Sequence, residues 1–321
     1  MPLIKSAYSG SPAYLYNGHL QTIVPSLTRK VVGVTYERER LLLSDGDFLD
    51  LDWVDGGQKR LVILTHGLEG DSRRQYILGA ARLFSSHGYD VLAWNCRSCS
   101  GEMNRAFRLY NHGEIGDIAE VINHALGIRH YQEVVLVGYS MGGNIILKYL
   151  GVHGRTAPDV IKRGIAVSSP TDLGASALLL DRPANRFYRN RFMKKLVKKL
   201  HHKANHFPGR LNMGQLKQVK YWRDFDDFFS APVNGYRDAR DFYDQASAVN
   251  FMPGIVVPTL LLNAQNDPLL SPECSPGWLA KSHPAVFLET PAVGGHVGFL
   301  VSRDLHTYAE RRALAFAQQL F

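Results

Sequence analysis

The segment 134–144 constrains the fold most, because an apolar run there ends in the pattern G-x-S-x-G, centred on Ser140. Residues 134–137 are apolar and mostly β-branched, which is typical of a buried strand in a parallel sheet. The apolar residues that follow, within 145–150, have the spacing of a helix. We therefore predict a strand, a sharp turn and a helix, with Ser140 at the turn.

A serine at such a turn is held in a strained backbone conformation that projects its hydroxyl away from the sheet. The following helix directs its N-terminal amides and the positive end of its dipole toward the serine, where they stabilise an anion. This arrangement is the nucleophile elbow of a serine hydrolase. The alternative is a tight turn in a Rossmann-like βαβ unit, because G-x-S-x-G also occurs by chance.

Apolar segments on both sides of this turn alternate between strand and helix patterns. Residues 32–43 and 48–54 are predicted to be antiparallel strands joined by a turn at 44–47. The remaining segments predict βαβ units with a parallel sheet. A strand is predicted to begin at residue 60, and others at 90–94, 134–137, 164–167, 258–263 and 285–289, with helices at 76–86, 115–126, near 278–281 and, capped by Ser302, at 303–320.

Between residues 171 and 250 the sequence becomes polar, basic and rich in aromatic residues, with helical spacing and no convincing parallel strand. We interpret this segment as a helical cap inserted into an α/β core, so that the core comprises residues 1–170 and 251–321. A chain of 321 residues, 45% of them hydrophobic, is long enough for one large domain with such an insertion.

Composition excludes several other classes of protein. The apolar runs are shorter than the roughly 18 to 20 residues that span a bilayer, and residues 1–16 do not resemble a signal peptide. Three cysteines, Cys96, Cys99 and Cys274, argue against a disulfide framework. Cys96 and Cys99 have C-x-x-C spacing, but a loop follows them and no second pair completes a zinc site. We expect a cytoplasmic protein with no metal and no organic cofactor.

A serine nucleophile needs a base to take its proton and a carboxylate to orient that base. In an α/β-hydrolase sheet these partners follow the serine in the order acid, then histidine, at the carboxyl ends of later strands. Asp267 follows the predicted strand 258–263, and His296 lies between glycines after the last strand. Asp267 alone is more typical of a turn. The order of the three motifs predicts a triad of Ser140, Asp267 and His296.

Two backbone amides are expected to stabilise the oxyanion that forms during such a reaction. One is the N–H of Met141, directly after the nucleophile, and the other is the N–H of Leu68 in the loop after the strand that begins at residue 60.

The motifs together resemble the AB-hydrolase-4 group of α/β-hydrolases. This group includes YheT-like bacterial esterases, plant Emb8-like proteins, yeast medium-chain ester synthase/esterases and animal hydrolases that act on phospholipids. The resemblance implies an esterase with Ser140, Asp267 and His296 as its triad; Asn266 departs from the pattern, since relatives often carry a second Asp there. The segments that carry it are 19–22, 65–72, 138–144, 267–268 and 295–299, with Asn95, Arg97, Ser100 and Gly101.

A second constellation has the H-x-x-x-x-D spacing of glycerolipid acyltransferases, formed by His112 and Asp117. The alternative is a helix N-terminus, where the negative charge of Asp117 suits the dipole. Because Ser140 already has a base in His296, we favour the structural interpretation.

The net charge of +8 is unevenly distributed, because the segment from Arg182 to Arg223 holds thirteen Lys or Arg and no acidic residue. Its apolar residues, Phe192, Leu196 and Leu200 among them, predict an amphipathic helix with a cationic face, and such helices lie on anionic membranes. We favour the alternative, a solvated face whose apolar side rests on the core. No motif for nucleic-acid binding accompanies the charge. Equal binding to neutral and anionic vesicles would contradict the membrane interpretation.

The sequence thus predicts a serine carboxylic-ester hydrolase acting on short- to medium-chain acyl esters or lipids through an acyl-enzyme. One alternative is an acyltransferase that passes the same acyl group to an alcohol or a lysolipid. Another is a non-catalytic protein that binds lipid surfaces on a hydrolase scaffold. Acyl-chain preference, head group and oligomeric state do not follow from the sequence.

Overall fold

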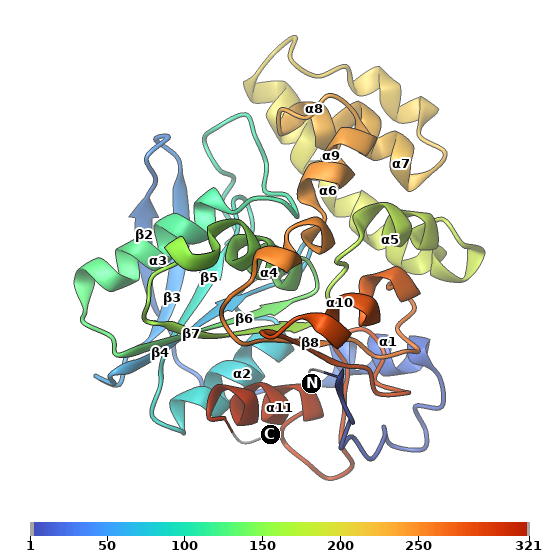
Figure 1. Ribbon diagram of the computed structural model, residues 1–321. Coiled ribbons are helices and arrows are strands. Elements are labelled where there is room, and N and C mark those ends of the chain that lie inside the picture. Colours follow the sequence, from blue (N-terminus) through green and yellow to red (C-terminus); the bar gives the residue numbers. More distant parts are fainter. Residues whose placement is uncertain (1–2, 320–321) are drawn as a thin grey trace.

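A computed structural model describes residues 3–319 of the chain. Its centre is a nine-stranded sheet in the order β1-β9-β8-β7-β6-β4-β5-β3-β2 (Figure 1). All neighbours pair in parallel except β2 with β3 and β3 with β5, which confirms the mostly parallel sheet. The strands are β1 (Leu3–Ile4), β2 (Glu37–Leu42), β3 (Phe48–Val54), β4 (Arg60–Thr65), β5 (Asp90–Asn95), β6 (Glu133–Tyr139), β7 (Ile161–Val167), β8 (Thr259–Leu262) and β9 (Val286–Glu289).

Helices cover both faces of the sheet (Figure 1). Successive side chains of a strand point to opposite faces, so β6 buries Leu136 on one face and Val137 on the other. One face packs against α2 and α11, and the other against α3, α4 and α10. Their bounds are α2 (Gln75–Ser85), α3 (Gly116–Ile128), α4 (Met141–His153), α10 (Gly277–Ser282) and α11 (Tyr308–Ala317).

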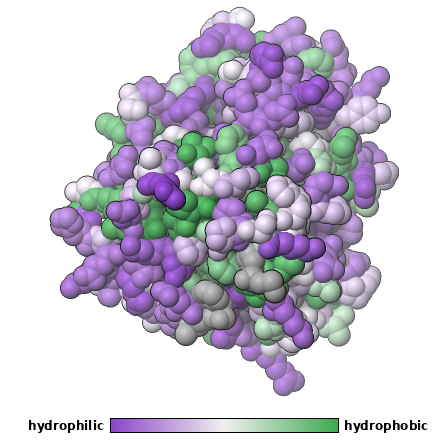
Figure 2. All heavy atoms as spheres, in the orientation of Figure 1, coloured by the Kyte–Doolittle hydropathy of each residue, from purple (hydrophilic) through white to green (hydrophobic). Residues whose placement is uncertain are grey.

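The connection from β7 to β8, residues 168–258, is helical and lies to one side of the sheet in Figure 1. Its apolar side chains form two clusters, one around Phe229, which also includes Leu109 of the core, and one around Phe242. Its outer surface is mostly hydrophilic in the upper part of Figure 2. Its helices are α5 (Leu173–Leu180), α6 (Arg186–His206), α7 (Trp222–Phe225), a π-helical turn (Asp226–Ser230), α8 (Ala231–Val233) and α9 (Ala239–Ala246).

Two predicted boundaries are wrong. The strand predicted at 32–43 is β2, which begins at Glu37 and not at residue 32, because Gly33 takes a left-handed conformation with φ of 83°. The last helix begins at Tyr308, and its N-cap is Thr307 and not Ser302. Thr307 and Glu310 form a capping box, and the left-handed backbone of Arg303, φ 59°, interrupts the helical pattern before it. The end of the predicted helix, residue 320, lies outside the described residues.

An N-terminal helix, α1 (Gly18–Thr28), is absent from the sequence prediction. It begins at Asn17, whose side chain accepts a hydrogen bond from the Leu20 amide, and it contains Pro25 in its interior. No helix within residues 3–319 has both the length and the apolar character needed to cross a bilayer.

Candidate active site

Ser140 lies at the turn between β6 and α4 with φ of 54° and ψ of −121°, a strained conformation for a residue with a side chain. Its amide donates to the carbonyl of Val167 on the neighbouring strand at 2.8 Å, which holds the turn against the sheet. A Cβ at Gly138 would overlap the backbone of Gly142, and a Cβ at Gly142 would overlap that of Thr65. The two glycines of G-x-S-x-G are therefore required by close packing.

The structure brings the three residues of the predicted triad together. Nε2 of His296 lies 2.9 Å from Oγ of Ser140, and Nδ1 of His296 lies 2.8 Å from Oδ2 of Asp267. A carboxylate on Nδ1 selects the tautomer that carries its proton there, so that Nε2 is free to accept the serine proton. The buried carboxylate of Asp267 also accepts the amide of Leu269 at 2.8 Å.

Helix α1 holds the loop that carries His296, a contact that sequence reasoning missed. Thr22 accepts the amide of His296 at 2.8 Å through Oγ1. Oε1 of Gln21 accepts both the amide of Gly294 and the side-chain amide of Asn266, at 2.8 and 2.9 Å. Asn266 in turn accepts the amide of Gly295 at 3.1 Å. Asn266, the departure from the family pattern, thus links the loop of the acid to the loop of the histidine.

The two predicted oxyanion donors lie beside the serine. Met141 is the first residue of α4, and a Cβ at Gly67, next to Leu68, would lie 3.0 Å from Cβ of Ser140. Within residues 3–319 neither the Leu68 amide nor the Met141 amide donates to another group. Two free backbone donors next to a serine can receive a negatively charged oxygen.

His66 fixes the conformation of the loop that carries Leu68. Its Nδ1 donates to the carbonyl of Gly67 at 2.8 Å, and its Nε2 accepts the amide of Cys96 at 3.0 Å. Complete burial lowers the pKa of His66 to about 4, so the ring is neutral near pH 7 and makes both bonds at once.

Helix α6 contacts the same loop through lysines. Nζ of Lys199 donates to Oε1 of Glu69 at 2.7 Å, and Nζ of Lys195 donates to the Glu69 carbonyl at 2.9 Å. The hydroxyl of Tyr110 donates to the same carboxylate at 2.6 Å. Glu69 has φ of 55° directly after Leu68, so these contacts hold a strained residue beside a predicted oxyanion donor.

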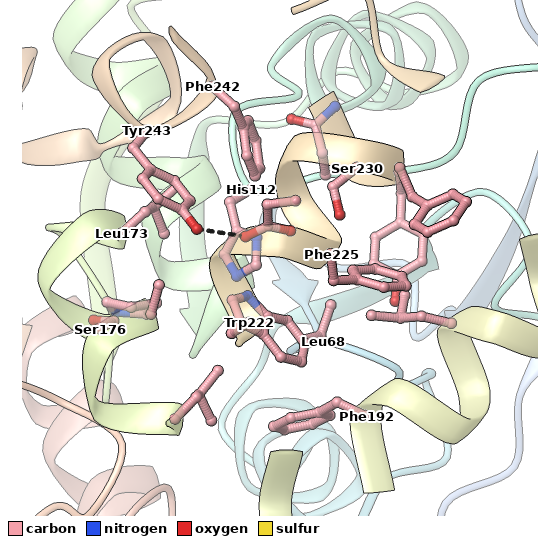
Figure 3. A pocket seen from close by; sticks show the side chains of 18 of the residues that line it. Leu68, His112, Leu173, Ser176, Phe192, Trp222, Phe225, Ser230, Phe242 and Tyr243 are labelled. Carbon is pink, nitrogen blue, oxygen red and sulfur yellow. Dashed lines mark hydrogen bonds between the residues drawn. The ribbon is translucent and has the colours of Figure 1, made fainter. Parts of the chain in front are cut away.

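An apolar pocket opens at Ser140 and His296 and encloses about 990 Å³, part of it open to solvent. Figure 3 shows side chains from the β7–β8 connection around it, including Leu173, Phe192 and Trp222. Its few polar groups include a hydrogen bond of 2.7 Å from the Tyr243 hydroxyl to Asp226, drawn as a dashed line in Figure 3. Burial raises the pKa of Asp226 to about 6. Such a lining suits a hydrocarbon chain.

His112 and Asp117 do not form a pair. His112 lines the apolar pocket, and burial lowers the pKa of its ring to about 4. Asp117 lies in a buried ion pair with Arg97, with Oδ1 and Nη2 2.7 Å apart. This separation agrees with the structural interpretation of the H-x-x-x-x-D motif.

The apolar side of α6 packs within the chain. Leu200 is buried, and Met193 and Leu196 join the cluster around Phe229. Nζ of Lys203 donates to the carbonyl of Asn104 at 2.7 Å. These contacts agree with the interpretation of a solvated face resting on the core, and membrane contact of the basic segment stays a prediction.

The family model described as "alpha/beta hydrolase fold" matches residues 60–302. The chain therefore belongs to the α/β-hydrolase fold family. It is 34% identical to "Putative esterase YheT" of Escherichia coli, over 90% of this chain and 86% of that protein. It is 30% identical to "Phospholipase ABHD3" of Mus musculus, over 99% of this chain and 80% of that protein. These relatives confirm the family predicted from the motifs.

Solved structures agree with the fold. The esterase Pf2001 of Pyrococcus furiosus superposes with a TM-score of 0.59 at 17% identity, covering 100% of this chain and 97% of that one.

The three cysteines are free thiols. Within residues 3–319 no group of three His, Cys, Asp or Glu side chains is arranged to hold a metal ion.

Proposed function

We propose that this protein is a serine hydrolase that cleaves carboxylic esters through an acyl-enzyme on Ser140. The observation that carries the proposal is the continuous hydrogen-bonded chain from Asp267 through His296 to Ser140, beside two free backbone amides. Membership of the α/β-hydrolase family and the names of the two relatives support it.

The first half-reaction follows from these positions. Oγ of Ser140 attacks the ester carbonyl carbon while Nε2 of His296 takes its proton. The carbonyl oxygen becomes an oxyanion, which the amides of Leu68 and Met141 stabilise. When this intermediate collapses, the C–O bond to the alcohol breaks and His296 returns the proton to the leaving oxygen. An ester between Ser140 and the acyl group is left.

The second half-reaction repeats these steps with water. His296 takes a proton from a water molecule, the hydroxide attacks the acyl carbon, and the acid leaves as Oγ of Ser140 regains its proton. Asp267 keeps the ring oriented and stabilises the imidazolium in both halves.

The substrates that we propose are short- to medium-chain acyl esters or lipids, with the acyl chain in the apolar pocket. We also propose that residues 171–250 act as a cap inserted into the core of residues 1–170 and 251–321. Side chains of this segment, among them Leu173, Trp222 and Phe242, line the pocket that opens at Ser140. The length and shape of the pocket therefore depend on how the helices of residues 171–250 pack over the core.

Hydrolysis of p-nitrophenyl esters from acetyl to palmitoyl tests the substrate class. We expect kcat/KM to rise with chain length by at least about tenfold as methylenes enter the apolar pocket, and then to fall once the pocket is full. Replacing pocket-lining Ala177 with Phe should shift the maximum to shorter chains. Adding ethanol and measuring ethyl esters separates hydrolysis from acyl transfer. A flat profile in both proteins would contradict the proposed acyl pocket.

We expect Lys199→Met to lower kcat about tenfold with little change in KM, because the loop that carries the Leu68 amide loses one of its anchors. Lys198→Met is the matched control, since Lys198 is exposed on the same helix. Lys199→Arg should restore most of the activity. Steady-state kinetics of the three variants at equal thermal stability provide the measurement, and equal kcat values for Lys199→Met and Lys198→Met would contradict this positioning role.

A further inference from the structure

A second pocket of about 730 Å³ lies against the same serine. Leu68, Ser140, Phe192, Leu269 and His296 line both pockets. The rest of its lining comes from α1, the start of α2 and the residue before it, the first half of α6, and the loops that carry Leu68 and His296. A carbonyl carbon bound at Ser140 would therefore adjoin two spaces, one for each part of an ester.

The second pocket differs from the first in charge. Arg74, the residue before α2, and Arg191 on α6 both line it, and no acidic side chain does. Within residues 3–319 neither arginine forms an ion pair, although buried arginines elsewhere, such as Arg97 and Arg312, lie within 3 Å of carboxylates. The charge of these two half-buried guanidinium groups is therefore left uncompensated.

The two arginines lie close enough to repel each other. Burial lowers the pKa of Arg191, and the positive charge of Arg74 lowers it further. Nε of Arg74 is buried and has no hydrogen-bond acceptor within the described residues. Holding two like charges together without a counterion costs free energy, which a bound anion would offset. Two guanidinium groups on different elements also match the several oxygens of a phosphate.

We propose that Arg74 and Arg191 bind a phosphate group on the alcohol part of the ester. This inference rests on the proposed function, because it assigns the acyl chain to the apolar pocket and the leaving alcohol to the second one. The enzyme would then prefer acyl esters whose alcohol carries a phosphate over neutral esters with the same acyl chain. A membrane surface fits these two residues less well, since both lie inside a pocket and not on an exposed face.

The test compares 1-octanoylglycerol with 1-octanoylglycerol 3-phosphate, which differ only in the phosphate. For wild type, Arg74→Gln and Arg191→Gln we measure the ratio of kcat/KM for the phosphate ester to kcat/KM for the neutral ester. We expect a ratio well above one in wild type and a fall of about tenfold in each variant. Arg73→Gln and Arg186→Gln are matched controls, because both arginines are exposed neighbours. They should keep the wild-type ratio.

A wild-type ratio near one, or an equal fall in the controls, would overturn the phosphate site while leaving the esterase intact. Cleavage of neither ester would overturn the proposed function instead. In that case calorimetric titration with glycerol 3-phosphate still tests the site. Binding to wild type that is lost in the Arg74→Gln/Arg191→Gln double variant would support it, and equal or absent binding would overturn it.

Discussion

Ser140→Ala is expected to lower kcat for a p-nitrophenyl ester by at least about 10⁴-fold. The reason is that, within residues 3–319, Oγ of Ser140 is the only side-chain hydroxyl hydrogen-bonded to Nε2 of His296, so its removal leaves no nucleophile to form the acyl-enzyme. The remaining rate would come from the backbone amides and from substrate binding. The measurement is the initial rate of hydrolysis at saturating substrate, with the wild type purified in parallel.

The substitution should leave the fold intact, because alanine keeps the Cβ and the packing around Gly67 and Gly142. Equal melting temperatures, within a few degrees, would show that the loss is chemical. A Ser140→Ala protein that retains a tenth of the wild-type rate would show that another residue carries the reaction.

Asp267→Asn is expected to lower kcat by about 10³- to 10⁴-fold. Asparagine has nearly the same shape, but its amide can donate to Nδ1 of His296 and so favours the tautomer with the proton on Nε2. That tautomer cannot accept the serine proton, and the imidazolium loses its negative partner. Steady-state kinetics on the same ester measure the effect.

Asp159→Asn controls for removal of a carboxylate, because Asp159 is exposed and precedes the start of β7, at the edge of the sheet opposite to the one that carries Ser140. It should have wild-type kinetics. If Asp267→Asn kept kcat within a factor of ten of wild type, a different acid would have to orient His296.

Local patterns explain how much of the site the sequence predicts. The strand, turn and helix around Ser140 are encoded within about fifteen residues, and the loops of Asp267 and His296 each follow a predicted strand. A parallel sheet brings the carboxyl ends of its strands to one edge, so chain order was enough to predict that these three residues meet.

The supports of the site depend on contacts that are distant in sequence. The bond from the His296 amide to Thr22 spans 274 residues, and Gln21 reaches Gly294 across 273. Asn17 is a typical N-cap residue at the start of α1, but Pro25 in the interior is atypical of a helix, so the sequence pattern does not predict one there. Thr307 and Glu310 have the T-x-x-E spacing of a capping box, and this pattern predicts the N-cap better than Ser302 does.

The pocket was the least predictable part. Its walls combine the loops of the core with helices of the β7–β8 connection, and the positions of Phe192 and Trp222 depend on how those helices pack. The sequence also does not predict that two arginines meet in the second pocket. Arg74 and Arg191 are 117 positions apart in the sequence, and only the fold brings them to one pocket.

Labelling with an acyl-enzyme analogue shows which residue is the nucleophile. The wild-type protein is treated with a fluorophosphonate, and its intact mass and its proteolytic peptides are measured by mass spectrometry. We expect one adduct per chain on the peptide that contains Ser140, and no adduct on Ser140→Ala. A folded wild-type protein that takes up no label, or takes it up at another residue, would show that Ser140 is not the nucleophile.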